Sequence, residues 1–86
     1  YEVPSGKIDI YCVDLKGQEV CVELKYPLAT GSVVGQLLKY REDIKARTGG
    51  KVPRCFLVCP TIPDKVKENL QRNSMEWREL SMDEGP

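Results

Sequence analysis

Two acids and a lysine near the start of the sequence, Asp9, Glu23 and Lys25, are residue types that bind divalent cations and handle phosphate. If Asp9 and Glu23 face each other across paired strands, their like charges repel unless something compensates. A hard cation such as Mg²⁺ can compensate, because it binds one or two carboxylates and keeps several waters. Lys25 shares a strand face with Glu23, where it can orient or help deprotonate a metal-bound water and stabilise charge on a phosphate.

A β-hairpin must position these side chains. Residues 7–14 and residues 18–26 alternate in polarity and are rich in β-branched and aromatic types, with the short segment 15–17 between them. Because the side-chain period of a strand is two, the length of the loop decides which residues face each other.

Two loop lengths compete at residues 15–17. A two-residue turn pairs Asp9 with Leu24, whereas a three-residue loop with Gly17 in the left-handed position pairs Asp14 with Gln18, and therefore the two acids with each other. The hydrophobic pattern favours the longer loop, because it separates a coherent apolar layer from a mixed face. The apolar layer comprises Ile8, Ile10, Cys12, Val20, Val22, Leu24 and Tyr26. The mixed face comprises Asp9, Tyr11, Val13, Glu19, Cys21, Glu23 and Lys25.

The three charged residues also have a simpler interpretation. Charges on one face of a hairpin are often its solvated side, and Glu23 with Lys25 is a common surface pair. Their position at the end of a strongly apolar strand favours a functional site, because α/β folds place their sites at such ends.

The rest of the chain completes an α/β fold of order β-β-α-β-α-β, a mixed sheet with helices packed on it. We expect helices at residues 32–48 and 61–72 and strands at residues 54–59 and 75–80. Ser32 and Thr61 are the expected helix caps. Residues 1–80 would form one domain, and residues 81–86 a disordered polar tail.

Composition places the chain among ordinary globular domains. Its 86 residues, with 41% apolar and 30% charged composition, are near the lower limit for a self-sufficient core. The first residue is Tyr1 rather than Met, so we expect a piece excised from a longer protein. The sequence contains no membrane-length apolar run and no signal peptide, which makes a cytoplasmic location the default expectation.

The net charge of zero argues against binding nucleic acid by bulk electrostatics alone. Residues 39–54 nevertheless carry six basic and two acidic side chains. Lys39, Arg41 and Lys45 are therefore candidate contacts to phosphate, although a solvated helix face explains the cluster equally well.

Four cysteines, Cys12, Cys21, Cys55 and Cys59, lie in strand-like segments, and we expect buried free thiols. The three-residue loop places Cys12 and Cys21 on opposite faces of the hairpin, which forbids a bridge between them. A zinc site is not indicated, because the chain has no histidine and no C-x-x-C motif.

Three blocks of the sequence, residues 6–10 (GKIDI), 20–25 (VCVELK) and 34–40 (VGQLLKY), occur in an order that resembles a known family. They are similar to the G-x-I-D, V-x-V-E-L-K and G-Q-L-x-x-Y blocks of PD-(D/E)xK nucleases. Among these, the chain most resembles the C-terminal nuclease domain of NucS (EndoMS) endonucleases. The resemblance covers about residues 6–80 and implies a restriction-endonuclease-like core.

Carried over by position, the resemblance implies that Asp9 and Glu23 bind Mg²⁺ or Mn²⁺, with the backbone carbonyl of Leu24 as a further ligand. It implies that Lys25 assists the nucleophilic water. The implied activity is a divalent-metal-dependent endodeoxyribonuclease that hydrolyses DNA phosphodiester bonds in DNA repair.

The resemblance also implies that Gln36 and Tyr40, one helical turn apart, line the site and support the positioning of phosphate or water. Each has an alternative explanation, because Gln36 can be solvated and Tyr40 can belong to an ordinary buried helix face.

The chain departs from the family pattern at its front. Family members usually have a helix before the first catalytic strand, often with a further acid, whereas only residues 1–5 precede the first block here. This puts independent activity in doubt, and a DNA-binding domain or a homodimer partner would lie outside this chain. The alternative function is a non-catalytic module for DNA positioning or protein assembly, with an exposed apolar patch around Met75 and Trp77. The sequence does not separate action on DNA from action on RNA.

Overall fold

Four strands form the main sheet of the computed structural model, which describes residues 1–80. They are β3 (Ile10–Val13), β4 (Glu19–Leu24), β5 (Arg54–Cys59) and β6 (Glu76–Glu79), in that order across the sheet. The first pair is antiparallel and the other two pairs are parallel. Parallel neighbours need a crossover, which α1 (Ser32–Arg47) supplies between β4 and β5 and α2 (Asp64–Arg72) between β5 and β6. The expected α/β order is confirmed.

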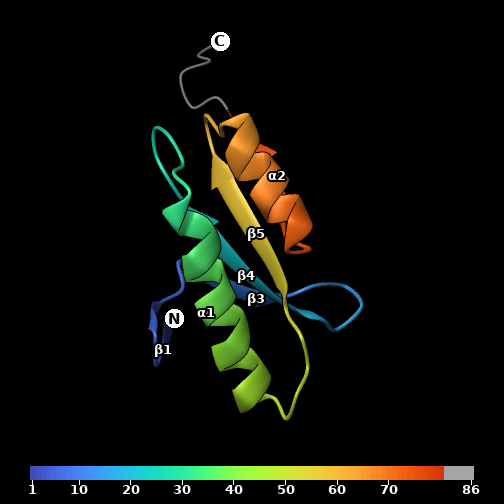
Figure 1. Cartoon of the computed structure of the whole chain (residues 1–86). Coiled ribbons are helices and arrows are strands. Elements are labelled where there is room, and N and C mark those ends of the chain that lie inside the picture. Colours follow the sequence, from blue (N-terminus) through green and yellow to red (C-terminus); the bar gives the residue numbers. More distant parts are fainter. Residues whose placement is uncertain (81–86) are drawn as a thin grey trace.

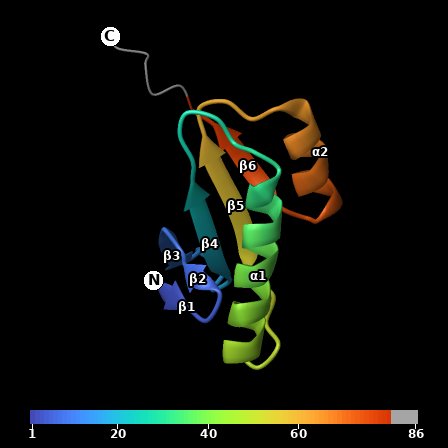
Figure 2. The ribbon, with the colours of Figure 1, turned by 60° about the vertical axis from the view of Figure 1, so that its left-hand side comes forward.

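Both helices cover the same face of the sheet (Figure 1, Figure 2), and the arrowheads of β4, β5 and β6 point the same way in Figure 2. The carboxyl ends of these strands therefore meet at one edge of the sheet, where the end of β4 places Glu23. Within residues 1–80, no helix combines the length and the apolar character needed to cross a membrane.

A short ribbon that the sequence pattern did not predict precedes the sheet. It consists of β1 (Glu2–Val3) and β2 (Gly6–Lys7), and its ends are tied by two hydrogen bonds between Tyr1 and Ile8, of 2.7 and 2.8 Å. Ile8 is fully buried and anchors the ribbon to the core. The expected strand at residues 7–14 is therefore divided, with Asp9 at the break.

The three-residue loop and its register are confirmed. Val13 pairs with Glu19, and the amide of Asp14 donates to the carbonyl of Gln18 at 2.9 Å. Gly17 has a φ of 82°, in the left-handed region that a side chain disfavours. Ile10 pairs with Val22, and Asp9 directly precedes this last pair of the ladder.

Burial of the hairpin does not follow its apolar and mixed faces. On the mixed face Cys21 and Glu23 are buried but Val13 is 60% exposed. On the apolar face Ile8 and Val20 are buried, whereas Ile10 is 44% and Leu24 48% exposed. The pattern separated the faces correctly but could not show which of them the helices cover. Helix α1 packs against β4, where Cys21 joins the core and Glu23 is buried beside it.

The helices begin differently from the expectation. Gly31 is the N-cap of α1 and Pro63 that of α2, and neither supplies a side-chain cap. The Ser32 hydroxyl instead bonds that of Thr30, at 2.8 Å. Thr61 forms a bridge with Leu28, which extends the strand region and delays the helix start.

Two expectations about apolar side chains also need correction. Cys21, Cys55 and Cys59 are buried free thiols as expected, but Cys12 is exposed. Met75 is buried and Trp77 packs against the core, so the expected apolar patch is absent from that part of the described chain. The tail at residues 81–86 lies outside the described residues.

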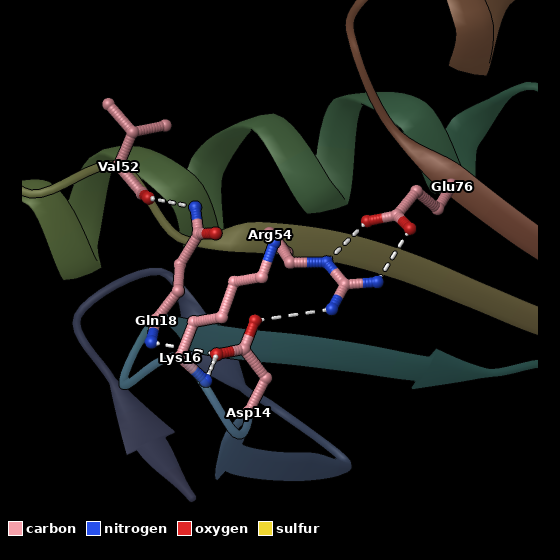
Figure 3. Close-up of polar contacts among 6 residues, drawn as sticks. All are labelled: Asp14, Lys16, Gln18, Val52, Arg54 and Glu76. Carbon is pink, nitrogen blue, oxygen red and sulfur yellow. Dashed lines mark hydrogen bonds and ion pairs between the residues drawn. The ribbon is translucent and has the colours of Figure 1, made fainter.

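Arg54 connects the hairpin loop to the far strand of the sheet (Figure 3). Its guanidinium donates two bonds to the carboxylate of Glu76, at 2.6 and 2.7 Å, and a weaker one to Asp14 at 3.3 Å. The other oxygen of Asp14 accepts the amides of Lys16 and Gln18, both at 2.9 Å. These contacts fix the loop conformation that sets the hairpin register.

The same cluster predicts a pH dependence of stability. Hydrogen bonds from the Gln18 amide lower the pKa of Asp14 below 3.8, and the Arg54 hydrogen bond lowers the pKa of Glu76 below 4.5. A carboxyl whose pKa is lower in the folded state stabilises the fold above its unfolded pKa and loses that effect as the pH falls. We expect the urea concentration at the unfolding midpoint to decrease as the pH is lowered below about 4.5. This decrease should be smaller in Arg54→Met. An equally steep fall in Arg54→Met would contradict the assignment.

Candidate functional site

Glu23, Lys25 and Asp9 meet at the carboxyl end of β4. Glu23 points under α1 and is 3% exposed, and the Nζ of Lys25 lies 3.2 Å from its Oε2. Asp9 comes from the break before β3, and its Oδ2 accepts the amide of Leu24 at 2.8 Å. The hairpin thus brings the three predicted residues together, as the register requires.

The environment of Glu23 disfavours its charged form. Burial raises the pKa of Glu23, the hydrogen bond from Lys25 lowers it, and the neighbouring charge of Asp9 raises it again. Its Oε1 is buried and has no hydrogen-bond partner among the described residues. A buried carboxylate oxygen without a partner is costly, and a bound cation is one way to compensate for that cost.

Gln36 and Tyr40 of α1 reach the same site. The Tyr40 hydroxyl donates to the backbone carbonyl of Lys7 at 2.7 Å and accepts from Nε2 of Gln36 at 2.8 Å. Burial raises the pKa of the Tyr40 phenol, and the charges of Glu23 and Asp9 raise it further. The phenol therefore lies within the electric field of the two acids.

A divalent cation fits the donors at this site. Mg²⁺ commonly uses one or two carboxylates and keeps its remaining waters, and Asp9 and Glu23 supply two. Within residues 1–80, no third acid, cysteine or histidine joins them. Leu24 contributes its amide to Asp9, and its carbonyl as a ligand stays a prediction. Glu19 also has an unpartnered buried oxygen, but its neighbour is the phenol of Tyr11 rather than a second acid.

The basic residues of α1 have different environments. Lys39 is exposed, Lys45 pairs with Glu42 at 3.6 Å, and Arg41 donates to the backbone carbonyl of Asn73 at 2.7 Å. Arg41 therefore links α1 to the end of α2. Contact of these three residues with nucleic acid stays a prediction.

One set of contacts near the site was missed. Ser5 donates its amide and its hydroxyl to the carboxylate of Asp43, across 38 positions of sequence. Asp43 lies seven residues beyond Gln36 and three beyond Tyr40, on the same side of α1. That spacing could have placed Asp43 on the side of α1 that faces the site, but nothing in the sequence indicates Ser5 as its partner.

Comparison with known proteins agrees with a nuclease fold. Residues 1–85 match the family Endonuclease NucS C-terminal domain. Endonuclease NucS of Aeropyrum pernix is 40% identical over 79 residues, which are 92% of this chain and 29% of that protein. Endonuclease NucS of Methanocaldococcus jannaschii is 31% identical over 85 residues, 99% of this chain and 32% of that protein.

Two solved structures share the fold. A repair endonuclease from Pyrococcus abyssi superposes with a TM-score of 0.85 at 30% identity, over 93% of this chain and 35% of that one. A structure of an EndoMS-dsDNA2 complex superposes with a TM-score of 0.84 at 28% identity, over 98% of this chain and 35% of that one. The chain thus has the fold of an endonuclease domain and spans about a third of the relatives it matches. It belongs to the family of endonuclease NucS C-terminal domains.

Proposed function

We propose that this chain is the catalytic domain of a divalent-metal-dependent endonuclease of the PD-(D/E)xK type that hydrolyses phosphodiester bonds of DNA. The supporting observation is the buried carboxylate of Glu23, whose Oε1 has no partner in the described part of the chain, next to Asp9 and Lys25. DNA is the proposed substrate because a structural relative is an EndoMS complex with double-stranded DNA.

The residues have separate tasks in this proposal. Asp9 and Glu23 hold Mg²⁺ or Mn²⁺, and when bound the cation supplies positive charge to the phosphate and makes water a better nucleophile. Lys25 orients the attacking water and stabilises negative charge as the phosphodiester is cleaved. Gln36 holds the Tyr40 hydroxyl, which keeps the polar side of α1 against the segment before Asp9.

Cleavage of double-stranded DNA by the protein, measured with and without metal, tests this function. We expect no cleavage in EDTA, recovery with Mg²⁺ or Mn²⁺, and slower cleavage of an RNA duplex of the same sequence. Equal cleavage in EDTA would contradict metal dependence. DNA binding without any Mn²⁺ binding would instead favour a non-catalytic positioning module.

A further inference from the structure

Helix α1 holds the ribbon of residues 1–7 at three positions along one side. Tyr40 donates to the carbonyl of Lys7 at 2.7 Å, and Asp43 accepts from Ser5, from its amide at 3.0 Å and also from its hydroxyl. One helical turn further, the guanidinium of Arg47 lies 4.7 Å from the ring centre of Tyr1. The three helix positions are spaced by three and four residues, so they form one continuous stripe.

The ribbon packs closely against this stripe. A Cβ atom at Gly6 would lie 3.4 Å from the Tyr40 hydroxyl, and Gly6 has a φ of 153°, a conformation that side chains rarely adopt. The next residues are Lys7, held by Tyr40, and Ile8, which is fully buried. The path of the chain into Asp9 is therefore fixed from the helix side.

The position of Asp9 depends on the path of this ribbon more than the position of Glu23 does. Glu23 lies within β4, which has a strand on each side, whereas Asp9 is exposed and precedes the first residue of β3. Its backbone partner in the described structure is the amide of Leu24. Small shifts of the ribbon would therefore change the separation of the two carboxylates.

We propose that Asp43, acting through Ser5, is a positioning residue that sets the placement of Asp9 relative to Glu23, with the Tyr40 contact to Lys7 as the second tie. The inference rests on the proposed function, since it concerns the same pair of acids. Asp43 itself does not contact either acid in the described contacts, and its effect is transmitted along the ribbon. Functional groups must be held to within about 0.5 Å, so a loosened ribbon weakens the site.

Mn²⁺ affinity, measured by titration calorimetry on the protein, tests this role. We expect Asp43→Ala to weaken Mn²⁺ binding by about tenfold, the lower end for partners that orient metal ligands. Ser5→Ala loses the hydroxyl bond but keeps the amide bond to Asp43, so it should weaken Mn²⁺ binding less. Asp43→Asn keeps an oxygen that can accept the Ser5 amide, so it should recover most of the affinity. Glu42→Ala is the matched control, because Glu42 is the neighbouring acid and pairs only with Lys45 in the described structure.

Amide exchange separates positioning from a general loss of stability. In Asp43→Ala without metal, we expect faster exchange at the Leu24 amide, which bonds Asp9, and unchanged exchange at the Lys25 amide, which bonds Val58 at 3.1 Å. Unchanged Mn²⁺ affinity in Asp43→Ala, or equal acceleration at both amides, would overturn the inference. If the wild-type protein binds no Mn²⁺, the proposed function fails, while the exchange comparison still decides the role of Asp43.

Discussion

Glu23→Gln is expected to weaken Mn²⁺ binding at least about a hundredfold, since even partners that only orient metal ligands are worth about 10–100-fold. The same substitution is expected to stabilise the metal-free protein at neutral pH. Burial raises the pKa of Glu23, so the folded state disfavours its charge, and a neutral amide of equal size removes that penalty. Calorimetric titration and urea unfolding measure the two effects.

The sign of the stability effect depends on pH. A carboxyl whose pKa is higher in the folded state costs no stability below its unfolded pKa and costs progressively more as the pH rises above it. The difference between Glu23→Gln and wild type should therefore vanish in acid and grow above the ordinary pKa of 4.5. Glu19→Gln, on the same strand face, is the control that should keep Mn²⁺ affinity. Retained affinity in Glu23→Gln would refute its role as a ligand.

Lys25→Met has the second large effect that we expect. Removing a positioned proton-transfer or charge-stabilising group costs about 10²–10⁴-fold in rate, so kcat for DNA cleavage should fall within that range. Lys25 is a cation 3.2 Å from Glu23, so its loss should not weaken Mn²⁺ binding at pH 8. Cleavage rates and metal titration on the same variant therefore separate catalysis from binding.

Lys16→Met is the matched control for Lys25. Lys16 lies in the loop at the other end of the hairpin and keeps its structural contact through its backbone amide, which a side-chain substitution preserves. The kcat of the Lys16→Met variant should equal that of the wild-type protein. If Lys25→Met cleaved DNA at the wild-type rate, Lys25 would have no part in the chemistry.

The hairpin shows what the sequence could predict. The position of Gly17 and the alternation on either side were sufficient for the loop length and the register, because a left-handed turn residue and a period of two are local properties. Which residues of the hairpin are buried could not be predicted in this way, because burial depends on where the rest of the chain packs. Glu23 thus lies in the core rather than in solvent.

The candidate site also has features that the sequence could predict and features that it could not. Asp9, Glu23 and Lys25 could be placed from the register, and Gln36 and Tyr40 from the resemblance to a nuclease family. The contact of Ser5 with Asp43 could not be predicted, since it joins residues 38 positions apart and depends on a ribbon of two short strands with no clear pattern. Such contacts arise from packing and not from local preference.

The central claim is that Asp9 and Glu23 together hold a divalent cation, and a crystal soaked in Mn²⁺ tests it most directly. The expected result is one strong anomalous peak within about 2.0–2.3 Å of a carboxylate oxygen from each residue, and no peak there in crystals of Glu23→Gln. A crystal with ordered Asp9 and Glu23 side chains and no Mn²⁺ between them would contradict it.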